Sequence, residues 1–129
     1  PRFDERRLGT EMRYLYTGGR ASKADALSFQ GLCRHDLQTG KEDAVTCAAH
    51  QTVAEPVFVP REPGTPGKEP DAENDGWLLQ LGYDGKRDRT FLDVTDAKAF
   101  ERMARVWAPT HLPLGFHGNF APDLFVDGE

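Results

Sequence analysis

His117 is the residue whose surroundings most clearly indicate chemistry. It lies in the apolar segment 112–120 (Leu-Pro-Leu-Gly-Phe-His-Gly-Asn-Phe), between Gly115 and Gly118. Imidazole is the commonest side-chain ligand for transition metals, and glycine lets a backbone or a cofactor approach closely. We therefore interpret the segment as a buried strand that presents a metal ligand, with a hydrogen-bonded core histidine as the alternative. One ligand does not make a metal site, so partners must come from elsewhere.

A second set of potential ligands lies near the middle of the chain. Cys33 and His35 are two residues apart, and Cys47 and His50 are three apart, which gives four side chains of the kinds that bind zinc. Zinc sites usually take pairs of ligands from a tight turn, and a one-residue gap on a strand holds such a pair awkwardly. Ordinary strand residues are the better interpretation. Two cysteines are also too few for a disulfide scaffold and fit a reducing cytosol.

Composition and charge narrow the class of protein. A chain of 129 residues has room for one ordinary domain, or part of one, and its start at a proline suggests processing, trimming or a fragment. The net charge is −5, and Lys and Arg are scattered among acidic residues, so the sequence has no basic stripe that could bind phosphates. Nucleic acid is therefore not an expected partner. No apolar run is long enough to span a bilayer, and the N-terminus is charged where a signal peptide is apolar. We expect a cytoplasmic protein, either soluble or peripherally associated with a membrane.

Short apolar runs separated by turn residues predict an all-β chain. A first hairpin is expected around the turn 37–41, which contains Gly40, and a second around 84–88, whose Asp-Gly step suits positive backbone angles. Repeated hairpins with little helix between them are typical of propeller blades or a sandwich. Strands are predicted at residues 29–36, 44–49, 57–59, 77–83, 90–94, 106–107 and 116–120.

Two segments depart from this pattern. Residues 60–75 are rich in Pro, Gly, Glu and Asp and almost lack large apolar side chains, so an exposed loop is expected. Residues 96–105 show helical spacing, because Ala97, Phe100 and Met103 or Ala104 recur at intervals of three and four residues after a potential cap, Asp96. A turn or two of helix is predicted there.

Several motifs, in a fixed order, resemble the C-terminal end of the carotenoid cleavage oxygenases. This family includes the lignostilbene dioxygenases and the isomerohydrolase of the retinal pigment epithelium. The resemblance runs from Pro1 to about Phe120, and several ordered motifs are more specific than any single one. The motifs are Pro1-Arg-Phe-Asp4 with Arg13-Tyr14, Glu55-Pro-Val-Phe-Val-Pro-Arg61, Asn74-Asp-Gly-Trp-Leu-Leu79, Leu92-Asp-Val-Thr-Asp-Ala97, Ala104-Arg-Val106 and Pro113-Leu-Gly-Phe-His-Gly118.

The resemblance implies a seven-bladed β-propeller with a non-haem iron(II) held by four histidines. Residues 1–129 would then be the C-terminal part of one propeller domain, comprising its last blades. By resemblance, His117 is the last of the four ligands and Glu55 accepts the remaining N–H of a ligand histidine. Independent physics supports both roles, because a ligating imidazole needs a partner on its other nitrogen and a carboxylate on an apolar strand needs a donor. His35, His50 and His111 match no ligand position of the family.

The implied reaction is oxidative cleavage of a conjugated carbon–carbon double bond by dioxygen, giving two carbonyl products. The substrate would be a carotenoid, apocarotenoid or stilbene, and Phe58, Phe116 and Phe120 are candidates either for its path or for plain packing. The other three ligands would lie outside this chain, so the 129 residues alone are expected to be inactive and to need the remaining blades as partner. Those regions would also carry any membrane contact. The alternative is a self-contained β-rich binding domain without a catalytic metal.

Overall fold

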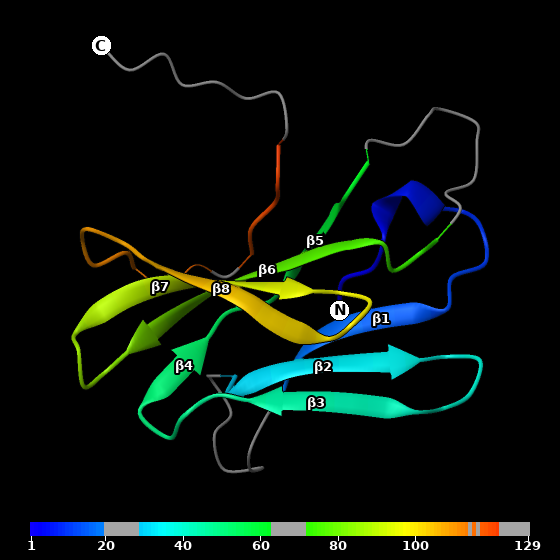
Figure 1. Ribbon diagram of the computed structural model, residues 1–129. Helices are drawn as coiled ribbons and strands as arrows, with labels where there is room; N and C mark the ends of the chain where they lie inside the picture. Colours follow the sequence, from blue (N-terminus) through cyan, green and yellow to red (C-terminus); the bar gives the residue numbers. More distant parts are fainter. Residues whose placement is uncertain (20–28, 63–71, 114, 116, 122–129) are drawn as a thin grey trace.

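The chain is all-β, as the sequence predicts, and its strands form two antiparallel β-sheets (Figure 1). The computed structural model describes residues 1–19, 29–62, 72–113, 115 and 117–121. The first sheet has the order β1-β2-β3. It is built from β1 (Tyr14–Gly19), β2 (Gly31–Asp36) and β3 (Glu42–Thr46).

The second sheet is larger and has five strands. Its order is β4-β6-β7-β8, and β5 also pairs with β6. The long strand β6 can hold both short strands because β4 pairs with its end at Gly82–Asp84 while β5 pairs with its start at Gly76–Leu79. The strands are β4 (Gln51–Val53), β5 (Val57–Pro60), β6 (Gly76–Asp84), β7 (Arg89–Asp96) and β8 (Glu101–Trp107).

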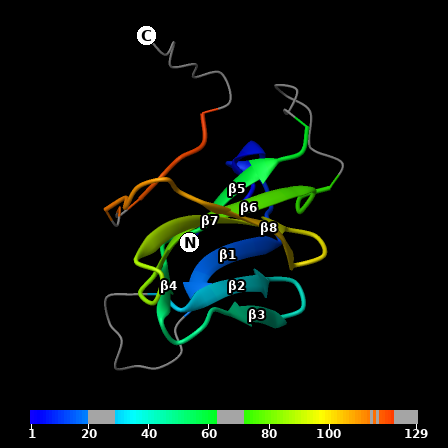
Figure 2. The same cartoon turned by 60° about the vertical axis from the view of Figure 1, so that its left-hand side comes forward.

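The hydrophobic core lies between the two sheets, which the two views show as adjacent groups of strands (Figures 1 and 2). Successive side chains of a strand point to opposite faces. Leu78 of β6 is fully buried in this core, whereas Leu81 on the other face is 42% exposed. Gln80 ties the sheets together, since its amide donates to the carbonyls of Gly31 and Ala54. The core comprises Tyr16, Leu32, Phe58, Leu78, Ala97 and Phe100.

Both predicted hairpins are confirmed, with one difference at the second turn. Gly40 has a φ of +70°, as expected for the turn between β2 and β3. In the turn between β6 and β7 the positive φ of 51° falls on Asp88. The Asp84-Gly85 step instead starts the turn through the Asp84 carboxylate, which accepts from the backbone N–H groups of Lys86 and Arg87.

The predicted helix at 96–105 is wrong, because these residues form the turn between β7 and β8 and most of β8. The Asp96 carboxylate does accept backbone N–H bonds, from Lys98 at 2.9 Å and Ala99 at 2.7 Å. Aspartate makes the same local bonds at a helix start and at a turn, so this signal could not separate them. The chain then reverses at Phe100, whose φ is +59°. The spacing of Ala97 and Phe100 reflects a turn folded over the core.

Two segments outside the sheets position the candidate site. The N-terminal segment runs beside β1, where Arg2 and Tyr16 exchange backbone hydrogen bonds of 2.7 Å, and continues into a short 3₁₀ helix, η1 (Glu5–Arg7). At the other end, the chain leaves β8. The predicted strand 116–120 is not seen in its described part, since residues 117–121 have no strand structure and Phe116 lies outside the described residues. Within the described ranges, no helix is long and apolar enough to cross a membrane.

Candidate metal-binding site

His117 and Glu55 meet although they are far apart in sequence. Glu55 follows β4 and precedes β5, and His117 lies beyond β8 on the C-terminal segment. The Nδ1 of His117 is 2.9 Å from Oε2 of Glu55. The Glu55 side chain is only 16% exposed, whereas that of His117 is 65% exposed. The expectation of a histidine buried in a strand is therefore wrong for this chain, but His117 does contact Glu55, the carboxylate expected to accept from a ligand histidine.

A third side chain, that of Arg2, joins this pair. Its Nε donates to the same Oε2 of Glu55 at 3.1 Å. Its Nη2 donates to the backbone carbonyl of Gly118 at 2.7 Å, and its Nη1 donates to Oδ1 of Asn119 at 3.0 Å. The arginine thus binds both the carboxylate and the residues that directly follow His117. The sequence interpretation missed this role, although Arg2 belongs to the Pro-Arg-Phe-Asp motif that it singled out.

The electrostatics favour an ionised Glu55. Partial burial alone would raise the pKa of this carboxyl group. The hydrogen bonds from His117 and Arg2, with the charge of the guanidinium, outweigh burial and hold the pKa of Glu55 below its usual value. Glu55 is therefore an anion at neutral pH that accepts from the imidazole.

An apolar cavity of about 180 Å³ adjoins His117, and we call it the outer pocket. It lies on the face of the five-stranded sheet that points away from the core, since Val57 and Leu79 line it while their neighbours Phe58 and Leu78 are core residues. Its lining gives this site an apolar wall. The lining residues are Ala54, Glu55, Val57, Leu79, Leu81, Leu92, Gly115, His117, Gly118, Asn119 and Phe120.

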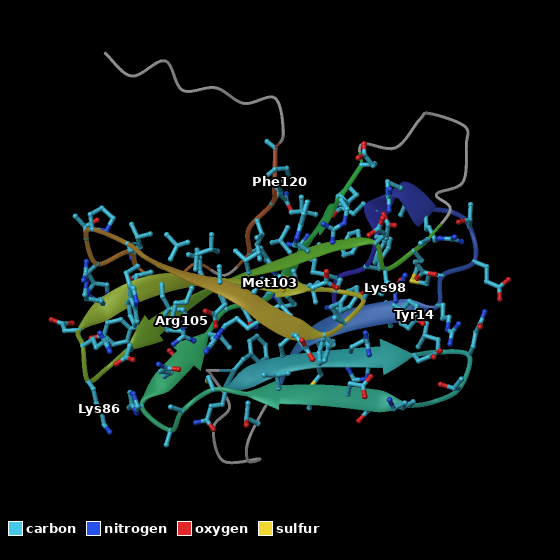
Figure 3. All side chains as sticks on the ribbon, viewed as in Figure 1. Tyr14, Lys86, Lys98, Met103, Arg105 and Phe120 are labelled. Carbon is cyan, nitrogen blue, oxygen red and sulfur yellow. The ribbon has the colours of Figure 1, made fainter. Side chains whose placement is uncertain are left out.

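The three phenylalanines proposed for the substrate path or for packing have different surroundings. Phe58 is a packing residue, because it is 7% exposed and stacks on Tyr16 at 5.9 Å between ring centres. Phe120 lines the outer pocket and is 49% exposed, on the segment that rises away from the sheets in Figure 3. Phe116 lies outside the described residues.

The zinc arrangement considered for the middle of the chain does not form. His35 contacts Thr17 and Glu42, and the Cys47 thiol donates to the backbone carbonyl of Gln51. His50 lies 3.5 Å from the Asp84 carboxylate. Across the described part of the chain, no three His, Cys, Asp or Glu side chains form a group that could hold a metal ion. Cys33 and Cys47 are both free thiols.

The arrangement at His117 suits one metal bond. A carboxylate that accepts the Nδ1 proton fixes the tautomer of the imidazole and makes Nε2 the basic nitrogen. This ring orientation is the one that metal-binding histidines commonly have. The described residues therefore provide one oriented imidazole beside an apolar wall, and any further ligands must come from other residues.

Comparisons with known proteins point to one family. The family model described as "Retinal pigment epithelial membrane protein" matches residues 1–122. The carotenoid cleavage oxygenase of Mycobacterium tuberculosis (strain ATCC 25618 / H37Rv) is 34% identical over 126 residues, which are 95% of this chain and 24% of the relative. The apocarotenoid-15,15'-oxygenase of Synechocystis is 32% identical over 123 residues, covering 94% of this chain and 24% of the relative.

Solved structures agree with these sequence matches. The crystal structure of the cobalt-substituted Synechocystis apocarotenoid oxygenase superposes with a TM-score of 0.78 at 32% identity, over 92% of this chain and 24% of that one. The chain thus spans about a quarter of the length of these relatives. The match over nearly the whole chain confirms the resemblance found in its motifs. The chain belongs to the family of the retinal pigment epithelial membrane protein and the carotenoid cleavage oxygenases.

Proposed function

We propose that this chain is the metal-binding C-terminal part of a non-haem iron(II) dioxygenase that cleaves a conjugated carbon–carbon double bond. The substrate class is a carotenoid, an apocarotenoid or a stilbene, and the products are two carbonyl compounds. The contact between His117 and Glu55 carries this proposal, because it orients an imidazole for a metal beside an apolar cavity. The relatives named as carotenoid and apocarotenoid oxygenases support the reaction class.

In this proposal His117 binds iron(II) through Nε2. Glu55 accepts the hydrogen bond from Nδ1–H and so fixes the tautomer in which Nε2 carries the lone pair that binds a metal. Bound iron(II) would supply the activation of dioxygen toward the double bond. The apolar side chains of the outer pocket would keep water from the metal and offer a surface to an apolar substrate.

The remaining ligands are proposed to come from residues outside this chain. A single histidine binds iron(II) weakly, since sites of neutral imidazoles rely on several ligands in a fixed arrangement. The two sheets would be the last blades of a propeller, and further blades would be arranged beside them around the central channel. The 129 residues alone are then expected to show no oxygenase activity. The structural likeness to a cobalt-substituted oxygenase supports a metal site in the full-length protein.

The test is a cleavage assay with the full-length protein. The protein is loaded with iron(II) and incubated in air with an apocarotenoid or a stilbene, and carbonyl products are identified by mass spectrometry. His117→Ala should bind less iron(II) and lose cleavage, whereas His111→Ala is a matched control, because His111 stacks on Tyr83 and does not line the outer pocket. Cleavage by His117→Ala at the wild-type rate would contradict the assignment of His117.

A further inference from the structure

We propose that Arg2 is a positioning residue of the metal site. Its guanidinium would hold the Glu55 carboxylate and the backbone after His117 in one arrangement, so that the imidazole presents Nε2 in a constant direction. This inference rests on the proposed function and adds to it a residue from the opposite end of the chain. Arg2 lies 53 residues from Glu55 and 117 residues from Asn119 in the sequence.

The first support is the number of different groups that one side chain reaches. Each of its three nitrogen atoms donates to a different acceptor, in Glu55, Gly118 and Asn119. His117 bonds to Glu55, and the other two acceptors lie one and two residues after it in the chain. Movement of the imidazole away from Glu55 would therefore strain the contacts of Arg2, and loss of Arg2 would free both the carboxylate and the segment.

The second support is the anchoring of Arg2 itself. Its backbone N–H and carbonyl each bond to Tyr16 at 2.7 Å, and Tyr16 is fully buried in the core. The Arg2 side chain is only 17% exposed. With its backbone fixed to the core and its side chain largely buried, Arg2 gives its guanidinium a fixed starting point, and its three contacts can hold other groups in place.

The third support is the shape of the group. Guanidinium is planar and presents its donors in a rigid fork, and bonds between two charged groups are about twice as strong as neutral ones. The ammonium of lysine is a compact point charge and cannot span Glu55, Gly118 and Asn119 in the same way. The contact of Arg2 with Glu5 is of another kind, since it is 3.7 Å long and Glu5 is 75% exposed. Such exposed pairs contribute little.

The test compares Arg2→Gln and Arg2→Lys with wild type in the full-length protein. Two readouts are independent of turnover: the dissociation constant for iron(II), measured without oxygen against a competing chelator, and the visible absorption spectrum of the cobalt(II)-loaded protein. Arg6→Gln is the matched control. Arg6 lies on the same segment and is 18% exposed, but its guanidinium donates to the buried Asp4 carboxylate and to the backbone carbonyl of Glu62 and not to the partners of Arg2.

We expect Arg2→Gln to weaken iron(II) binding about tenfold, in the range known for groups that orient metal ligands, and to alter the cobalt(II) spectrum. Arg2→Lys should recover only part of the affinity. Arg6→Gln should lower the thermal midpoint but leave affinity and spectrum unchanged. Wild-type affinity and spectrum in Arg2→Gln, or full recovery in Arg2→Lys, would overturn the positioning role while leaving the proposed function intact. If wild type binds neither metal, the proposed function fails, and this inference fails with it.

Discussion

Replacing Glu55 by glutamine should weaken metal binding without changing the fold. Oε2 of Glu55 accepts from both His117, at 2.9 Å, and Arg2, at 3.1 Å. Glutamine keeps the size of the side chain but has no charge and only one oxygen. Its amide nitrogen is a donor, so it repels any N–H group that it faces. Even with its oxygen in the place of Oε2, where it can accept both contacts, glutamine turns the bond from His117 into one with a neutral acceptor, which is weaker.

The size of the effect follows from these contacts. A hydrogen bond to a charged group contributes about 1.5–3 kcal/mol, and a neutral one about 0.5–1.5 kcal/mol. We count only the bond from His117, since the bond from Arg2 keeps a charged donor. The difference for this bond is about 1–1.5 kcal/mol, and solvent around the 65% exposed imidazole makes this an upper value. Since about 1.4 kcal/mol corresponds to tenfold, iron(II) binding should weaken by at most about five- to twelvefold.

The assay is an anaerobic iron(II) titration of the full-length protein against a chelator of known affinity. Glu42→Gln is a matched control, because Glu42 binds Nδ1 of His35 at 2.8 Å in the same kind of pair but at a different place. Its iron(II) affinity should equal that of wild type. An affinity of Glu55→Gln within twofold of wild type would refute the reasoning, as would an equal loss in Glu42→Gln.

Two further predictions concern stability. Phe58→Ala should lower the free energy of unfolding by about 3–5 kcal/mol, because Phe58 is 7% exposed in the core. Phe120 is 49% exposed, so Phe120→Ala should change this free energy by less than about 0.5 kcal/mol. Urea denaturation measures both, and equal losses would contradict the assignment of Phe58 to the core. Hydrogen bonds from Arg13 hold the pKa of Asp36 well below its usual value, so this pairing stabilises the fold above about pH 4 and is lost as pH falls through the lowered pKa. Between about pH 4 and pH 2, the free energy of unfolding should therefore fall less in Arg13→Gln than in wild type. If denaturation curves show the same pH dependence in both proteins, this pairing does not contribute as described.

The hairpins could be predicted because their signals are local. Gly40 lies between apolar runs of strand length, and a positive φ is what glycine provides there. The turn at Asp96 shows where local signals fail. An aspartate followed by apolar residues at positions 97 and 100 fits both a helix start and a turn that covers a core, and only the pairing of β7 with β8 decides between them.

The site could be predicted only in part. His117 and Glu55 were identified through motifs, and the structure places them in contact. The role of Phe58 follows from alternation along β5, since its neighbour Val57 faces the outer pocket. The contacts of Arg2 join both ends of the chain and leave no periodic or local pattern in the sequence. Only the folded arrangement brings its side chain to Glu55.

The most direct test of the central claim is a crystal structure of the full-length protein loaded with iron(II) without oxygen, with anomalous diffraction recorded at the iron edge. We predict an iron peak about 2.0–2.3 Å from Nε2 of His117, while Nδ1 still bonds to Glu55. An iron peak bound by other residues, with His117 out of reach of the metal, would contradict the account.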